Sequence, residues 1–131
     1  MGHLRAYLAG NRGVFVPLLT AALGLLGYTH PRITDGIGIT ELGRAAPDLL
    51  VLDLDAVETN PIELLRMTRF VLPACMIAVY SSTLQLSWAH ACHLAGANCV
   101  LSKSSDVTQI AAGLSQGITR GCFTDPSFVA A

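Results

Sequence analysis

The sequence predicts a doubly wound α/β domain, in which one parallel β-sheet carries helices on both faces. Short apolar runs typical of strands alternate with helical patterns along the chain, as expected for successive βα units. Hydrophobic residues make up 52% of the chain and charged residues only 13%, which suits central strands that are buried on both faces. The length of 131 residues is sufficient for one domain with its own core.

The first half of the chain contains two predicted βα units. Leu4–Ala9 forms the first strand, and Val14–Leu26 forms the first helix. Pro17 lies near the start of this helix, where the missing N–H is tolerated, so we expect a late helix start. Tyr28–Thr34 is a weaker second strand, followed by a short helix over Ile37–Ala46.

The middle of the chain gives the clearest pattern. Leu49–Leu54 is a continuous apolar run of strand length. Asn60–Glu63 then supplies a capping residue, a proline at the first helical position and an acid at the third, and the helix should continue to about Phe70. Cys75–Tyr80 is the fourth predicted strand.

The last part of the chain repeats the alternation twice. Ser82–Gln85 resembles a capping box that opens a helix ending near Gly96. Cys99–Leu101 is a short fifth strand, and Asp106–Gln109 should cap the final helix. The predicted inner face of that helix is formed by Val107, Ile110, Ala111, Leu114 and Ile118.

These elements predict five parallel strands in the order 2-1-3-4-5, because βα crossovers are right-handed. The domain should span residues 1–120. Ligands of such sheets bind at the carboxyl ends of the strands. The residues that follow those ends are Gly10 and Asn11, Asp53, Ser81, and Lys103. Lys103 is also the only lysine of the chain.

Composition excludes several classes of protein. The apolar run Val14–Leu26 is too short to span a membrane, and the first residues lack the pattern of a signal peptide. The formal charge is −1 and the chain has no basic tail, so the sequence does not predict a basic surface that binds nucleic acid. The four cysteines form no CxxC pair, as expected for reduced thiols in a cytoplasmic protein.

Four segments, in this order and spacing, resemble the motifs of one known family. They are Pro47–Leu54, Ile77–Ser81, Gly96–Lys103 and Gly121–Pro126. Together they resemble the response-regulator receiver domain of bacterial two-component systems, which has a flavodoxin-like (CheY-like) fold. The last segment resembles the exit from receivers of the NarL/FixJ type, which continue into a helix-turn-helix domain. The resemblance therefore implies that residues 121–131 begin a linker toward a covalently linked DNA-binding domain outside this chain.

The resemblance also implies roles for single residues. Asp53 takes the position of the phospho-acceptor, Ser81 that of the switch hydroxyl, and Lys103 that of the phosphate-binding lysine. In the family, the acceptor, a nearby carbonyl and an acidic pair hold Mg²⁺, which spreads the charge of the transferred phosphoryl group.

The sequence departs from this family pattern at the metal site. Gly10 and Asn11 stand at the acidic-pair positions, and Val100 stands where the family has its switch aromatic. Mg²⁺ prefers anionic oxygen ligands, so we expect weak or absent Mg²⁺ binding and no other metal or cofactor, although Asp55 could compensate in part. A partly buried Asp53 needs a counter-charge, for which Lys103 and Arg12 are the candidates.

These observations predict a regulatory module rather than an enzyme. The leading hypothesis is a receiver of an atypical transcriptional regulator that acts by dimerisation or ligand sensing without phosphorylation. The sequence does not decide whether a histidine kinase is a partner. The alternative is a working phospho-acceptor that uses Asp53 with a weakened metal site. A flavodoxin-like enzyme or nucleotide binder is disfavoured, because the chain has no phosphate loop and no nucleophile–base pair.

The side of the predicted fourth and fifth helices is the candidate dimer face. Leu84–Ala95 carries no Asp, Glu, Lys or Arg, whereas solvent-facing helices usually alternate apolar and charged residues. Leu84 and Trp88 are the candidate contacts with a second copy or a related receiver, although Trp88 could equally belong to the core. A zinc site at His90, Cys92, His93 and Cys99 is a weaker reading, because two of these residues fall on buried positions.

Overall fold

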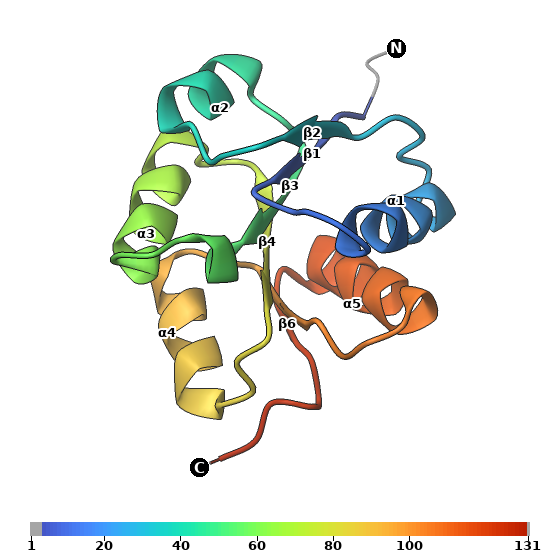
Figure 1. Cartoon of the computed structure of the whole chain (residues 1–131), viewed down its shortest axis with the longest axis vertical. Helices are drawn as coiled ribbons and strands as arrows, with labels where there is room; N and C mark the ends of the chain where they lie inside the picture. Colours follow the sequence, from blue (N-terminus) through green and yellow to red (C-terminus); the bar gives the residue numbers. More distant parts are fainter. Residues whose placement is uncertain (1–3, 131) are drawn as a thin grey trace.

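The computed structural model describes residues 4–130 and consists of one parallel sheet between two layers of helices (Figure 1). The strands are β1 (Ala6–Ala9), β2 (Arg32–Thr34), β3 (Leu49–Asp53), β4 (Met76–Ser81), β5 (Cys99–Ser102) and β6 (Phe123–Thr124). The helices are α1 (Phe15–Leu25), α2 (Ile39–Ala45), α3 (Pro61–Val71), α4 (Leu86–Ala95) and α5 (Val107–Arg120), with a short 3₁₀ helix, η1 (Leu54–Ala56).

The strand order is β2-β1-β3-β4-β5-β6, and all five strand pairings are parallel. The predicted α/β class and the predicted order of the first five strands are therefore confirmed. The predicted number of strands was wrong, because Phe123 and Thr124 add a sixth strand beside β5. These residues belong to the segment that the sequence indicated as the start of a linker.

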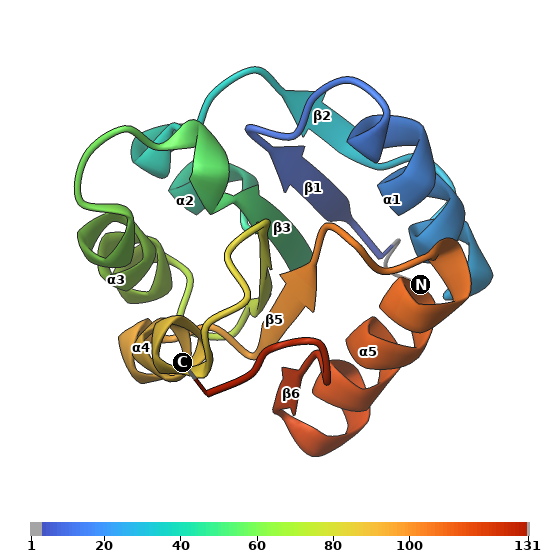
Figure 2. The same cartoon turned by 60° about the horizontal axis from the view of Figure 1, so that its bottom comes forward.

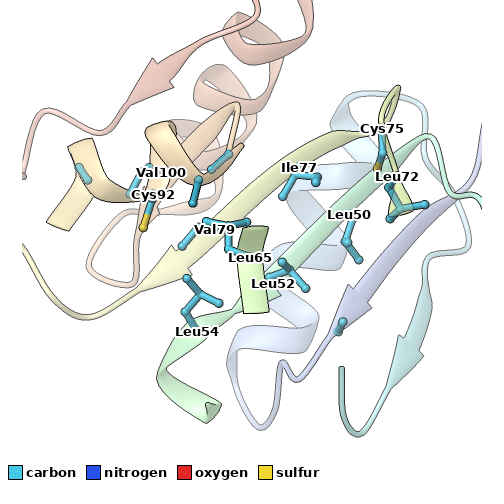
Figure 3. Close-up of a cluster of buried hydrophobic side chains, with 14 of the residues drawn as sticks. Leu50, Leu52, Leu54, Leu65, Leu72, Cys75, Ile77, Val79, Cys92 and Val100 are labelled. Carbon is cyan, nitrogen blue, oxygen red and sulfur yellow. The ribbon is translucent and has the colours of Figure 1, made fainter. Parts of the chain in front are cut away.

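The helices cover the sheet unequally (Figure 2). α1 and α5 pack together on one face, while α2, α3 and α4 lie side by side on the other. All five residues of β3 are buried, and their side chains alternate between the two faces. Leu50 and Leu52 join the core beneath α2–α4 (Figure 3), whereas Leu49 and Val51 join the core beneath α1 and α5.

The helix starts confirm one predicted cap and correct two. The Asp106 carboxylate accepts a hydrogen bond from the Gln109 backbone, and the Gln109 side chain accepts one from the Asp106 backbone. Asn60 instead has a left-handed backbone and makes no side-chain cap. The Ser82–Gln85 capping box was also wrong, because α4 begins only at Leu86. Within residues 4–130, no helix has the length and apolar character needed to cross a membrane.

The C-terminal residues dock along the outer edge of β5. The Phe123 N–H donates to the Asn98 carbonyl at 2.8 Å, and the Asp125 N–H donates to the Val100 carbonyl at 3.0 Å. Farther along, Val129 forms an isolated parallel bridge with Gln85. We call residues 123–129 the C-terminal strap. Its docking explains why the edge of β5 is covered.

Candidate functional site

The carboxyl ends of β3, β4 and β5 bring three of the predicted site residues together. Asp53 ends β3, Ser81 ends β4, and Lys103 follows β5 directly. The Lys103 ammonium lies 2.8 and 3.0 Å from the two carboxylate oxygens of Asp53. The Asp53 side chain is only 7% exposed, so this ion pair is largely removed from water. The parallel topology explains the convergence, because all carboxyl ends meet at one edge of the sheet.

A second carboxylate completes the ion-pair cluster. The Lys103 ammonium also lies 3.0 Å from the carboxylate of Asp55, which η1 places just beyond β3. Asp55 accepts further hydrogen bonds from the Ser81 hydroxyl at 3.2 Å and from the Ser82 N–H at 2.9 Å. Burial alone would raise the pKa of Asp55, but the bonds from Lys103 and Ser82 outweigh it and lower that pKa.

The same balance fixes the charge of the lysine. Burial favours the neutral amine, but hydrogen bonds and charge attraction from Asp53 and Asp55 outweigh it and raise the pKa of Lys103. The lysine therefore stays cationic at neutral pH. With two carboxylates and one ammonium, the cluster keeps a formal charge of −1.

Two aromatic rings complete the surroundings of the lysine. The Lys103 nitrogen lies 4.8 Å from the ring centre of Phe15 and 5.7 Å from that of Tyr80. The two rings meet edge to face, with centroids 5.5 Å apart. Burial, and next the charge of Asp53, raise the pKa of Tyr80 to about 12, so the phenol is neutral. Cation–π attraction therefore adds to the ion pairs that hold the ammonium in place.

The positions of the family's acidic pair serve structural purposes in this chain. Gly10 has a φ of 79°, a left-handed conformation that suits glycine. Asn11 is buried, and its amide donates to the carbonyls of Val51 at 3.0 Å and Ala9 at 3.4 Å. Asn11 thereby ties β1 to β3. The Arg12 guanidinium donates to the carbonyl of Asp35 rather than pairing with Asp53.

These contacts decide whether the residues fit a magnesium ion. The site has two carboxylates, those of Asp53 and Asp55, but the Lys103 ammonium lies between them within 3.0 Å of each. Gly10 contributes no side chain, and the Asn11 amide nitrogen donates to main-chain carbonyls. The Asn11 Oδ1 is buried without a hydrogen-bond partner among the described residues, so Asn11 offers one neutral oxygen in place of a carboxylate. Mg²⁺ requires about six oxygen ligands in octahedral geometry and repels a neighbouring ammonium. The arrangement therefore does not fit the metal that the resemblance implies.

The remaining predicted positions lie away from the ion-pair cluster. Val100, at the switch-aromatic position, is fully buried on β5. Leu84 is 36% exposed, just before α4. Trp88 is partly buried against the core beneath α2–α4, and its indole nitrogen has no hydrogen-bond partner among the described residues. Core packing therefore accounts for part of the Trp88 side chain.

The cysteines and histidines of α4 and β5 form no metal centre in the described part of the chain. Burial raises the pKa of Cys92 and Cys99 to about 12, which keeps both as thiols. The His93 ring lies with Nδ1 2.9 Å from the Ala97 carbonyl and Nε2 2.7 Å from the Thr124 hydroxyl. His93 therefore links α4 to the C-terminal strap.

Sequence reasoning missed the contributions of Phe15, Tyr80 and the strap. The two rings face Lys103 from α1 and β4, which are far apart in the sequence, and an aromatic residue in an apolar run gives no signal of such a contact. The cluster opens onto a concave surface lined by residues from three loops. These residues are Gly10, Arg12, Gly13, Val14, Phe15, Asp53, Asp55, Ala56 and Lys103.

Comparison with known proteins gives matches only at the level of structure. No protein-family model and no curated protein matches the sequence. A response regulator from Thermotoga maritima superposes with a TM-score of 0.76 at 19% identity, over 88% of this chain and 97% of that chain. The isolated receiver domain of RcsB from Salmonella enterica serovar Typhimurium gives 0.74 at 14% identity, over 97% and 96%.

A LuxR-family two-component response regulator from Aurantimonas sp. SI85-9A1 is also similar, with a TM-score of 0.70 at 22% identity, over 95% of this chain and 91% of that chain. These identities are too low to carry residue roles from one chain to the other. They do show the architecture: the chain has the fold of response-regulator receiver domains.

Proposed function

We propose that this chain is a receiver-type regulatory module that signals without phosphorylation, because an internal ion pair closes its acceptor site. The observation that carries the proposal is the position of the Lys103 ammonium, 2.8 Å from Asp53 and 3.0 Å from Asp55. Receiver domains are generally signalling modules rather than enzymes. The proposed role is therefore regulatory.

The ion pair opposes phosphorylation at its first step. Both oxygens of Asp53 are engaged, because Oδ1 accepts from the Asp55 N–H at 3.0 Å and both oxygens contact Lys103. An attacking carboxylate oxygen would have to leave these partners. Phosphoryl transfer also needs cations that neutralise the developing charge, and the donor set here does not suit Mg²⁺.

The hydroxyl at the switch position has an internal partner too. The Ser81 hydroxyl donates to Asp55 and accepts from the Thr83 N–H at 3.0 Å. In the unmodified protein it is therefore already directed toward the carboxylates. We infer that the unmodified protein holds a single closed arrangement of this site.

The output of such a module must come from contacts of the unmodified protein. We propose association with a second copy, or with a related receiver, through the α4 side that includes Leu84 and Trp88. α4 has no acidic residue in its first turn, and His93 is the basic residue of its last turn. A linked DNA-binding domain in the full-length protein is part of the proposal. One structural neighbour belongs to the LuxR family, and another RcsB structure concerns DNA interaction.

The proposal is tested by incubating the chain with Mg²⁺ and acetyl phosphate and measuring its intact mass. We expect no added phosphoryl group and no Mg²⁺ binding heat in calorimetry. The chain offers a matched comparison, because Lys103→Ala removes the closing cation, while Asp53→Asn removes the nucleophile. A phosphoryl adduct on the unmodified sequence that disappears in Asp53→Asn would overturn the proposal.

One specific observation favours the alternative, a working phospho-acceptor with a weakened metal site. Asp53, Ser81 and Lys103 lie together at one edge, and the concave surface beside them reaches Asp53. The mass measurement separates the two functions directly, since only the alternative predicts a labelled Asp53.

The proposed association face has its own control within α4. Leu84→Glu places a charge on the α4 side and should weaken association in sedimentation experiments. Leu94 lies near the end of α4 and is 90% exposed, so Leu94→Glu tests a charge of equal size at the other end of this side of the domain. Equal behaviour of the two variants would remove Leu84 from the interface.

A further inference from the structure

The C-terminal strap occupies the outer edge of β5 as a strand would. Its backbone satisfies groups of β5 and of the segments on either side. Phe123 donates to Asn98, Asp125 donates to Val100, and Val129 both donates to Leu84 at 2.9 Å and accepts from Leu86 at 2.8 Å. The strap therefore runs from the amino end of β5 to the start of α4, and no further strand lies beyond it in the described chain.

Side chains also fasten the strap, and one of them is Thr124, whose hydroxyl lies 2.7 Å from Nε2 of His93 on α4. Phe128 is only 5% exposed and belongs to the core beneath α2–α4. The buried Asp125 carboxylate accepts from the Ser105 hydroxyl at 2.6 Å and from the N–H and hydroxyl of Ser127 at 2.9 and 2.6 Å. Burial would raise the pKa of Asp125, but these hydrogen bonds outweigh it and lower that pKa.

A glycine of α5 makes room for the strap's first aromatic ring. A side chain at Gly113 would overlap the ring of Phe123, so the ring lies directly against the helix backbone. Regular sheet pairing between the strap and β5 involves only Phe123 and Thr124. Local contacts of this size open more readily than a central strand does.

The ends of the strap show where it could detach. Gly121 has a φ of 81° and ends α5, and both Gly121 and Cys122 are exposed. On the other side, Val129 is 60% exposed. The strap is thus preceded by an exposed glycine turn and ends at an exposed valine.

Release would uncover surface that needs a new partner. The carbonyl groups of Asn98 and Val100 would lose the N–H donors of Phe123 and Asp125, and the place of Phe128 in the core beneath α2–α4 would open. Unpaired strand edges are templates for pairing with another chain. The exposed Leu84, whose carbonyl accepts from Val129, lies at the end of the same surface.

We propose that the C-terminal strap is the movable element of this module: docked, it covers the β5 edge, and released, it lets the β5 edges of two copies associate. This inference rests on the proposed function, in which output comes from self-association of the unmodified protein. Docking of the strap and association of two copies use the same backbone groups of β5, so each excludes the other. Apparent affinity between copies is then reduced by the fraction of chains whose strap is docked.

The inference is tested on the full chain with Asp125→Ala, which removes the acceptor of three hydrogen bonds, and with Phe128→Ala. Sedimentation should show association at least about tenfold tighter than in the unmodified chain, because the competent fraction rises. Hydrogen exchange should show faster exchange of the Phe123 and Asp125 amides, with β3 and β4 still protected. Emission from Trp88, the only tryptophan, should shift as its surroundings open. Pro126→Ala, at an exposed strap position, is the matched control.

Two outcomes would overturn the inference. One is a variant whose strap amides exchange faster and whose sheet amides stay protected, but whose self-association in sedimentation is no tighter than that of the unmodified chain. The other is unchanged protection of the Phe123 and Asp125 amides in both variants, which would show that these contacts do not hold the strap. Neither outcome depends on phosphorylation. Phosphorylation of Asp53 would contradict the proposed function, whereas only the exchange and sedimentation measurements can contradict the strap inference.

Discussion

Two edges of the sheet are closed by the chain's own atoms, but by different forces. At the carboxyl ends of the strands, an ammonium between two carboxylates closes the site, and both carboxylates belong to neighbouring residues of one segment. At the outer edge of β5, backbone hydrogen bonds and one buried ring close the surface. The first closure is local and electrostatic, whereas the second depends on the C-terminal strap, which we propose can leave as a unit.

This difference predicts different responses to mutation. Removing one charge from the first site leaves its partners buried and repelling each other, which destabilises the whole domain. Removing one contact from the strap shifts a local equilibrium first and global stability less. The following predictions proceed from the largest expected effect to the smallest.

Lys103→Met should lower the free energy of unfolding by about 3 kcal/mol, because it leaves the Asp53 and Asp55 carboxylates facing each other without a cation. Urea denaturation measures this directly. In Lys103→Met combined with Asp53→Asn, one charge is removed as well, and part of the loss should be recovered. A single variant as stable as the unmodified chain would show that the ion pair does not hold the site.

Asp125→Ala should lower the free energy of local strap opening, rather than that of global unfolding, by about 2 kcal/mol, since hydrogen bonds to a charged group contribute roughly 1.5–3 kcal/mol and the Ser105 hydroxyl loses its acceptor. Because the strap can open locally, the amides of Phe123 and Asp125 should exchange much faster while the unfolding midpoint moves little. Comparable losses of protection in β3 would place the strap within the global folding unit and break the comparison between the two edges.

Acid should weaken both edges. The pKa values of Asp55 and Asp125 lie below their ordinary value of 3.8. Their contribution to stability is therefore complete above that ordinary value and is lost as pH falls through the lowered folded-state values. Unfolding followed between pH 6 and pH 2 should show this decline, and Asp125→Asn should reduce it. A pH-independent stability across this range would contradict the assigned hydrogen bonds.

Glu63→Gln gives the smallest expected effect, less than about 0.5 kcal/mol. The Glu63–Arg66 ion pair on α3 has side chains 55% and 61% exposed, and exposed pairs contribute little. The variant serves as the baseline for charge removal in this chain. If its loss in urea denaturation matched that of Lys103→Met, burial would not explain the role of Lys103.

The sequence was most informative where the pattern is local. The apolar run of β3 predicted a buried central strand, and parallel topology then placed Asp53 and Lys103 at one edge. The Asp106 cap was predictable because its partner, Gln109, is three residues away. These features depend on neighbouring residues or on rules of strand connection.

The features that were missed depend on contacts between distant segments. β6 has two residues between a glycine turn and Pro126, and it is a strand only because β5 offers an edge. The start of α4 shifts to Leu86, whose N–H donates to Val129 in the strap. Asn11 was predicted as a lost metal ligand, and its actual bond to Val51 could not be inferred without the distance between β1 and β3.

The contact between Gly113 and Phe123 has a consequence for how this chain can diverge. Because a side chain at Gly113 would overlap the Phe123 ring, volume added to α5 must be subtracted from the strap. Gly113→Ala should loosen the strap without altering any strap residue, and Phe123→Leu should restore docking only when paired with it. The side-chain volumes at the two positions are therefore coupled. In related chains, a larger residue at position 113 should occur together with a smaller residue at position 123.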